Sequence, residues 1–344
     1  MRFPKRWRGT GIFLFLVFVA AACSPRDPEP FEFHQVGETM GTTYSVKISK
    51  LPTDLERSEL GAEIEACLER VNASMSTYRM DSELSQLNQN RSTEWIEISK
   101  PLADVIDESL KISVLSDGAY DVTVGPLVNL WGFGPEGPRQ TAPDPSDISA
   151  RRQQTGFRKI HLNTDRTAIR KDVAEIYIDL SSLAKGYGVD QLGELLEKFG
   201  IENYLVEVGG ELRVKGERPD GGAWNIAIEK PLAGQRAIQQ VIHLKDIAVA
   251  TSGDYRNFFE DRGIRYSHTI DPGTGMPIAH SLASVTVMEK SAMRADALAT
   301  AFMALGPEAG LKLAEDQQIA ALFIVRKGSG FVTLNSPAFP SEAG

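Results

Sequence analysis

Cysteine and histidine are scarce in this sequence. Its 344 residues include two cysteines, Cys23 and Cys67, and five histidines that do not group with them. This scarcity excludes a zinc site of the Cys/His type and catalysis by a thiol. Because Ile64, Leu68 and Val71 surround Cys67 at helical spacing, we predict that its thiol is buried and packs as a small hydrophobic group.

Positive charge is also in short supply. The chain has 37 Lys and Arg against 46 Asp and Glu, which gives a net charge of −9. Residues 1–22 contain four basic and no acidic residues, so the chain without them would carry −13. Such an acidic protein is a poor partner for nucleic acid, whose binding depends on Lys and Arg. It would also repel an anionic small molecule unless a metal ion or a local basic group intervened.

The N-terminal segment is typical of a secretory signal peptide. Basic residues precede the apolar run 11–19, and small residues then lead into Cys23, an order that indicates export. The run is too short to span a bilayer core of about 30 Å comfortably. Because the cysteine position resembles a lipobox, we expect residues 1–22 to be removed, Cys23 to be lipidated and 23–30 to form a Pro-rich tether. An uncleaved anchor is the alternative, since Ala20 stands where leucine is commoner.

The folded body of the protein is expected to span residues 31–344. Apolar residues recur at helical spacing over 60–75, 101–115, 184–200 and 293–305, with a shorter helix from Pro307. Residues 132–147 are predicted to be a long loop. Strand-like runs cover 43–48, 204–208, 224–228, 241–250, 265–270, 282–288, 320–325 and 331–334. Strands in succession favour meanders, so we predict an α+β fold, with largely antiparallel sheets and packed helices in a single compact body.

Five groups of segments are richer in glycine, hydroxyl and acidic residues than core packing requires. They are 40–44, 76–88, 117–134, 178–188 and the C-terminal pieces 251–255, 267–275 and 295–301. An ordinary strand start, helix end or turn would account for some of them taken singly. Tyr78 follows a predicted helix, where its ring is either a stacking face for a ligand or simply partly buried.

The segment 178–188 runs from a strand through a turn into a helix. Free N–H groups and the positive end of the helix dipole, with Lys185 nearby, favour an anion there. The glycines and the lysine are in the wrong order for a phosphate loop. Ser181 or Ser182 would cap the helix in any case, but capping does not explain Asp179 and Lys185 together.

Asp296 and Thr300 are four residues apart in a predicted helix, so they share one face. A carboxylate and a hydroxyl are hard oxygen ligands that suit Mg²⁺ better than zinc. Surface or capping roles are the ordinary alternative for such a pair. Among the histidines, His268 lies in a setting rich in glycine and hydroxyl groups, whereas His34, His161, His243 and His280 do not.

Taken together, these segments resemble one known family. The motifs MGT, STYR, DGAYDVTVGPLVNLWGFG, IDLSSLAKGYGVD, VEVGGELRVKG, ATSGDYRNFF, YSHTIDPGTG and ADALATAFMALG occur in order between Met40 and Gly306. They are similar to those of the FAD:protein FMN transferase family, the ApbE-like lipoproteins. The resemblance implies a transferase that uses Mg²⁺ to move the FMN moiety of FAD onto a threonine or serine hydroxyl of a target flavoprotein, with release of AMP.

The resemblance also implies site residues. Magnesium is expected at the backbone carbonyl of Ser182 and the side chains of Asp296 and Thr300. His268 is the expected general base, with Asp271 or the metal as alternatives. FAD is expected to contact Met40, Tyr78, Ala119, Tyr120, Asp121, Asp179, Lys185 and Ile270.

Two positions depart from the pattern of some family members. Ala299 stands where some members carry a further acid, which leaves a second metal ion open. Lys185 stands where some have glutamate, and a lysine there would reach the pyrophosphate.

Two other functions remain open on the sequence alone. With water as nucleophile, the same site would make an FAD pyrophosphatase that yields FMN and AMP. A non-catalytic, periplasmic flavin-binding lipoprotein is the second alternative, which Asp296 and Thr300 disfavour. The expected partners are FAD, the membrane through the N-terminal lipid, and an acceptor protein with a Thr/Ser flavinylation motif, such as a membrane redox-pump subunit. The expected location is the bacterial cell envelope, facing the periplasm.

Overall fold

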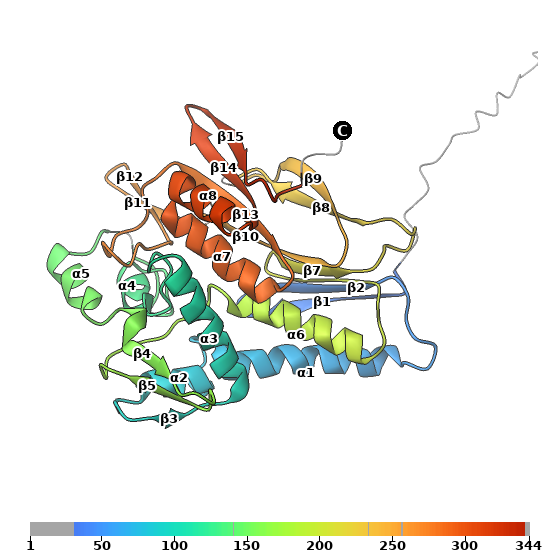
Figure 1. Cartoon of the computed structure of the whole chain (residues 1–344), viewed down its shortest axis with the longest axis horizontal. Coiled ribbons are helices and arrows are strands. Elements are labelled where there is room, and N and C mark those ends of the chain that lie inside the picture. The colour runs from blue at the N-terminus through green and yellow to red at the C-terminus, as the bar shows by residue number, and fades with distance from the viewer. Residues whose placement is uncertain (1–30, 140, 233, 256, 341–344) are drawn as a thin grey trace, which may run out of the picture.

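The structure is a computed structural model that describes residues 31–340 except 140, 233 and 256. The expected signal peptide 1–22, Cys23 and the tether 23–30 lie outside the described residues. An antiparallel eight-stranded sheet forms the centre of the molecule (Figure 1). In spatial order its strands are β1 (Phe33–Thr39), β2 (Thr42–Ile48), β6 (Tyr204–Val208), β7 (Glu211–Lys215), β10 (Ile247–Gly253), β13 (Leu282–Glu289), β14 (Ala320–Lys327) and β15 (Gly330–Asn335).

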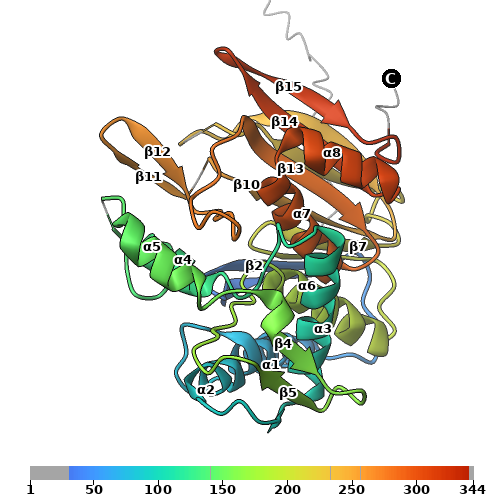
Figure 2. The ribbon, with the colours of Figure 1, turned by 60° about the vertical axis from the view of Figure 1, so that its left-hand side comes forward.

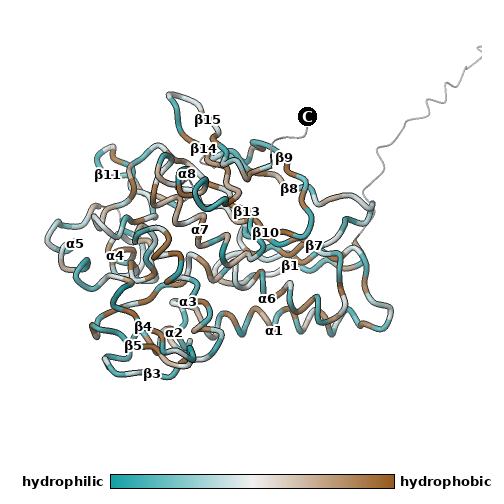
Figure 3. Tube along the Cα trace, viewed as in Figure 1, coloured by the Kyte–Doolittle hydropathy of each residue, from teal (hydrophilic) through white to brown (hydrophobic). Residues whose placement is uncertain are grey.

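Helices cover one face of this sheet. They are α1 (Arg57–Met75), α6 (Ala184–Lys198), α7 (Ala292–Leu305) and α8 (Pro307–Asp316). α6 packs on β6 and β7, and α7 packs on β10 and β13. α1 is amphipathic, with Leu60, Ile64, Leu68 and Val71 buried, and Figure 3 shows hydrophobic and hydrophilic residues alternating along it. Cys67 is buried in the same row, as predicted.

A two-stranded sheet covers the opposite face. It consists of β8 (Trp224–Glu229) and β9 (Ile238–Leu244). Trp224 and Leu244 of this sheet share a buried cluster with Leu212 of β7 and Val249 of β10. The large sheet is therefore buried on both faces near β7 and β10, which fixes these strands firmly.

A smaller group of elements extends the same core. It contains α2 (Glu83–Gln89), α3 (Lys100–Leu115), a short helix (Phe157–Lys159), and the sheet β3 (Ile96–Glu97), β5 (Ala168–Lys171) and β4 (Ile160–Leu162). Its residues Ile106 and Ile169 belong to one apolar cluster with Phe302 of α7. The prediction of a single compact α+β body is thus confirmed.

Four further elements lie beside the cavity described below. In Figure 2, α4 (Gly125–Leu130) and α5 (Pro145–Arg152) face the hairpin of β11 (Phe258–Asp261) and β12 (Ile264–Ser267). Trp131, Phe133, Phe259 and Tyr266 connect the two groups through ring contacts.

Three predicted boundaries were wrong. The run 241–250 is not one strand but parts of β9 and β10, which turn at Asp246 with a φ of 53°. The strand predicted over 265–270 ends at Ser267, and Ile270 forms an isolated bridge with Pro277. The loop 132–147 is shorter than predicted, because α5 begins within it at Pro145, a residue preorganised for a first helical turn.

The contact between α6 and α7 is close because a glycine lies in it. A Cβ at Gly186 would collide with the backbone carbonyl of Ala292 on α7. Asp190, one turn further along α6, accepts hydrogen bonds from Ser291 Oγ (2.7 Å) and from the backbone N–H groups of Ala292 and Met293 (3.0 Å each). These bonds satisfy donors at the start of α7 that no intrahelical partner reaches, so the two helices are held in register.

This contact predicts that alanine substitutions at two glycines of α6 change the free energy of unfolding by different amounts. Gly186→Ala is expected to lower the free energy of unfolding by about 2 kcal/mol, because backbone must move to admit the methyl group. Gly188→Ala is the matched control, since the nearest atom to its Cβ would be the terminal methyl of Met40 at 2.9 Å, the end of a flexible side chain rather than backbone. Urea unfolding of both variants measures the difference, and equal stabilities would contradict the close contact.

Among the described residues, no helix is both long enough and apolar enough to cross a membrane.

Candidate active site

A cavity of about 1310 Å³ brings the predicted segments together. It lies at the ends of β7 and β10, beside the N-terminal part of α6 and the middle of α7. Every residue predicted to contact FAD or the metal lines it, as does His268. Those residues are Met40, Tyr78, Ala119, Tyr120, Asp121, Asp179, Ser182, Lys185, Ile270, Asp296 and Thr300.

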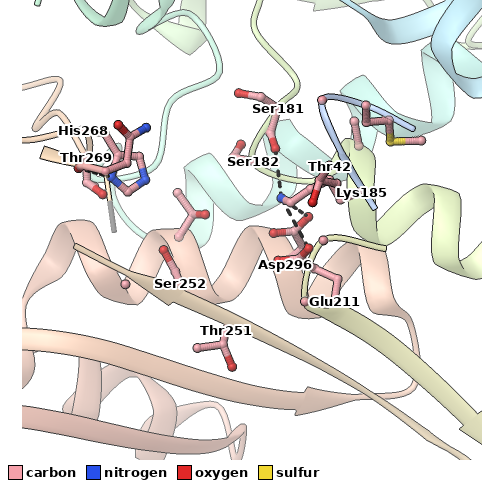
Figure 4. Close-up of a pocket in the computed structure, with 18 of the residues that line it drawn as sticks. Thr42, Ser181, Ser182, Lys185, Glu211, Thr251, Ser252, His268, Thr269 and Asp296 are labelled. Carbon is pink, nitrogen blue, oxygen red and sulfur yellow. Dashed lines mark hydrogen bonds and ion pairs between the residues drawn. The ribbon is translucent and has the colours of Figure 1, made fainter. Parts of the chain in front are cut away.

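One end of the cavity is a buried charge cluster. Lys185 Nζ lies 3.5 Å from Asp296 Oδ2, 3.5 Å from Glu211 Oε2 and 3.5 Å from the carbonyl oxygen of Ser181. Figure 4 shows the ammonium group of Lys185 between these oxygens. The backbone N–H of Gly186 also donates to Asp296 Oδ2, at 3.1 Å. Asp296 is therefore held by the first turn of α6, and Lys185 fixes the position of its charge.

Two carboxylates share one ammonium group, and the pKa values of all three groups reflect this. Burial raises the pKa of Asp296 above its ordinary value, while Lys185 opposes the shift. Burial raises the pKa of Glu211 as well, and the charge of Asp296 adds to the rise. Burial alone would lower the pKa of Lys185, but the two carboxylates outweigh it and raise the pKa. Two buried carboxyl groups therefore face a single ammonium group, and a further cation beside them would stabilise their ionised forms.

The oxygen ligands at this end suit a hard divalent ion. Asp296 and Thr300 both face the cavity from α7, and Ser182 lies in the turn before α6. In the part of the chain that the structure describes, no three His, Cys, Asp or Glu side chains come together as a metal site. The Asp296 carboxylate, the Thr300 hydroxyl and the Ser182 carbonyl are oxygen donors, a set that would suit Mg²⁺ better than zinc. Ala299 is fully buried in the apolar core and offers no ligand.

The turns around the cavity are held by side chains that face away from solvent. The buried Tyr120 shares a 2.8 Å hydrogen bond between its hydroxyl and Ser182 Oγ. Asp121 accepts hydrogen bonds from the backbone N–H groups of Thr123 (2.8 Å) and Phe157 (2.9 Å). Asp179 accepts one from Ser181 N–H at 2.9 Å. The carboxylate of Asp121 therefore shapes its loop, and residues 119–121 of that loop line the cavity.

Apolar and aromatic groups line the rest of the cavity. Met40 sits in the β1–β2 turn with a φ of 51°, and Ile270 is buried in the wall. Tyr78 is 70 % exposed at the rim. This exposure agrees with the interpretation of the Tyr78 ring as a stacking face, because a packed structural tyrosine would be largely covered.

His268 faces the cavity from the segment after β12. Its Nδ1 lies 3.1 Å from the carbonyl oxygen of Asn257, and its ring meets Phe133 edge-on at 6.3 Å between centroids. Burial lowers its pKa below the ordinary value of 6.5, so the ring is neutral at pH 7. Figure 4 shows it across the cavity from Lys185. The carboxylate of Asp271, the alternative base, accepts bonds from Gly273 N–H (2.8 Å) and Thr274 Oγ1 (2.9 Å) and does not line the cavity.

Sequence reasoning missed Glu211 as a site residue. It follows the two glycines of the β6–β7 turn, within the motif VEVGGELRVKG. An acid directly after two glycines was the available signal. The pattern of apolar residues in the two strands did not indicate to which side of the turn the Glu211 side chain would point.

The fold and the cavity define an α+β enzyme whose large site combines a buried charge cluster with apolar and aromatic walls. The chain belongs to the ApbE family, whose family model matches residues 40–323.

Named relatives support this assignment. The FAD:protein FMN transferase of Vibrio cholerae is 49% identical over 308 residues, which cover 90% of this chain and 92% of the relative. That of Haemophilus influenzae is 48% identical, with 88% and 89% covered. A solved structure, Flavin Transferase ApbE from Vibrio cholerae, matches with a TM-score of 0.84 and 48% identity over 90% of this chain and 99% of that one.

Proposed function

We propose that this protein transfers the FMN moiety of FAD to a threonine or serine hydroxyl of a target flavoprotein and releases AMP. The observation that carries the proposal is the composition of one cavity. It combines the buried Asp296 and Lys185 cluster with a histidine whose pKa is lowered, on opposite sides of a space large enough for a dinucleotide. Two relatives that share about half of their aligned residues with this chain are named FAD:protein FMN transferase, which supports the same activity.

The proposed reaction is a displacement at the FMN-side phosphorus of FAD. The acceptor hydroxyl oxygen forms a bond to that phosphorus, and the bond from the phosphorus to the bridging oxygen breaks, so that AMP leaves with this oxygen. His268 accepts the proton of the attacking hydroxyl. When bound at Ser182, Asp296 and Thr300, Mg²⁺ would neutralise charge on the phosphate oxygens. Lys185 is placed to bind the same oxygens.

The remaining cavity residues would hold the flavin nucleotide. Tyr78 offers a ring face at the rim, and Met40 and Ile270 offer apolar contacts. The loop at Ala119 and Tyr120 presents its backbone to the ligand. At about 1310 Å³, the cavity exceeds the roughly 300–1,000 Å³ of ordinary ligand pockets. The additional volume supports entry of an acceptor segment beside FAD.

The experiment that tests this function is direct. The protein is incubated with FAD, MgCl₂ and an acceptor domain that carries a short Asp-Gly-Ala-Thr segment, and the acceptor is weighed by mass spectrometry. We expect a gain of one FMN on the acceptor and none on its Thr→Ala copy. Free FMN and AMP with an unmodified acceptor would instead favour the FAD pyrophosphatase. Bound, unreacted FAD would favour the non-catalytic flavin-binding protein.

We also propose that the enzyme is anchored by lipid on Cys23 and faces the periplasm, where membrane redox-pump subunits are the expected acceptors. The supporting pattern is the basic, apolar and small-residue order before Cys23. Cys23→Ala is expected to move the protein from the membrane fraction to the soluble or precursor fraction of a bacterial host. Cys67→Ala is the control, because its thiol is buried. An unchanged distribution of Cys23→Ala would contradict lipid anchoring.

A further inference from the structure

Glu211 is a buried carboxylate that the proposed mechanism does not use. It is the first residue of β7 and follows Gly209 and Gly210, whose φ values of 63° and 108° form the tight β6–β7 turn. Its side chain is only 4% exposed. Oε2 has no hydrogen-bond partner among the residues that the structure describes, and it lies 3.5 Å from Lys185 Nζ in an ion pair.

A buried carboxylate with so few partners is costly, because water no longer solvates its charge. Lys185 does not balance it alone, since the same ammonium group also serves Asp296, whose side chain is 7% exposed. Asp296 has a second donor in Gly186 N–H, whereas Glu211 Oε2 has none in the described chain. A further positive charge on the side of Glu211 would therefore stabilise its ionised form.

The two carboxylates are close enough to act on one ion. Each lies 3.5 Å from the same Nζ atom, and both line the cavity. Figure 4 shows them side by side beneath the ammonium group. Mg²⁺ in proteins keeps several of its waters and is held through one or two carboxylates, so a second acid at this distance lies within reach of a hydrated ion at Asp296.

We propose that Glu211 is a positioning residue of the cation site: its carboxylate is the second negative charge that, with Asp296, sets the affinity for a divalent cation. The proposal rests on the metal dependence of the proposed function. It adds a residue from β7, on the sheet, to ligands that come only from α7 and the turn before α6. Lys185 would then shift its contact from the carboxylates towards the phosphates of FAD as the cation binds.

The test measures cation binding without turnover. Mn²⁺ is titrated into detergent-solubilised full-length protein without FAD, and the electron paramagnetic resonance signal of free Mn²⁺ gives the Kd. Glu211→Gln is expected to raise the Kd about 10-fold, as the loss of groups that support metal ligands commonly does. Glu211→Asp, which keeps the charge, should recover part of the affinity and also guards against a folding defect in the glutamine variant.

Glu207→Gln is the matched control. Glu207 lies before the same turn and lines the same cavity, but its Oε1 already accepts a 2.8 Å hydrogen bond from Gly210 N–H. We expect its Kd for Mn²⁺ to stay within about twofold of the wild-type value, because its charge is half-buried and already partnered.

The outcomes separate this inference from the function it rests on. Asp296→Asn is measured in the same series and should lose Mn²⁺ binding. If Asp296→Asn loses binding while Glu211→Gln binds Mn²⁺ as wild type does, Glu211 serves only to orient Lys185 and the inference is overturned. If Asp296→Asn also binds as wild type does, the metal site of the proposed function is wrong.

Discussion

Asp296→Asn is expected to reduce FMN transfer about 1,000-fold. The substitution keeps the size of the side chain but removes a buried negative charge that would hold the cation against the phosphate oxygens. A loss of about 4 kcal/mol of transition-state stabilisation corresponds to this factor. Because Gly186 N–H donates to Asp296 Oδ2, the amide oxygen of asparagine can keep that bond and the fold should persist.

The rate of covalent flavin attachment to the acceptor measures the effect. Thermal unfolding checks that the variant is folded. Asp316→Asn is the control, because Asp316 is an exposed acid on α8 that pairs with Lys312 at 2.7 Å. A transfer rate for Asp296→Asn within tenfold of wild type would show that the charge of Asp296 does not support the reaction.

His268→Ala is the second large change, with an expected loss of transfer of about 10²–10⁴-fold, the usual contribution of a general base. FAD binding should remain, because the ring lies across the cavity from Lys185, the residue placed to bind the phosphates. Quenching of flavin fluorescence measures binding, and the mass of the acceptor measures transfer. His161→Ala is the control, since His161 pairs with Asp172 on the surface of β4. Wild-type transfer by His268→Ala would remove the assignment.

The pH dependence gives a separate test of His268. Its pKa lies below the ordinary 6.5 because the ring is buried, so the neutral form that accepts a proton persists as the pH falls through 6.5. The acidic decline of wild-type transfer should therefore have its midpoint below pH 6.5. The residual rate of His268→Ala should lack this acidic decline. A decline centred above pH 6.5 would contradict the buried, neutral ring.

Three residues of the candidate site carry local signals in the sequence, whereas the expected FAD contacts were predicted from the family resemblance. Lys185 lies in the first turn of a helix, and Asp296 and Thr300 have helical spacing, so each could be placed on its element before any tertiary contact was known. The arrangement of strands was not equally visible. Residues 241–250 form one continuous strand-like run in the sequence, and only the left-handed backbone at Asp246 divides it between two sheets.

Glu211 shows what local patterns could not supply. Its role depends on the direction in which the β6–β7 turn points its side chain and on the approach of α6 to α7. Glu211 and Asp296 are more than 80 residues apart along the chain. The ion pairs with Lys185 are tertiary contacts that no spacing rule encodes. Because Lys185, Glu211 and Asp296 are far apart in the sequence, the sequence indicated an anion-binding site but not all of its charged residues.

The carboxylate of Asp190, which ties the start of α7 to α6, has a consequence for how the enzyme works. Lys185 and Asp296 sit on two helices that are already locked together, so loading the site requires little rearrangement of the backbone. A preformed site of this kind spends no binding energy on assembly. The rate of turnover should then depend on how quickly the acceptor brings its hydroxyl into the site. Flexible acceptor segments should therefore be modified faster than rigid ones.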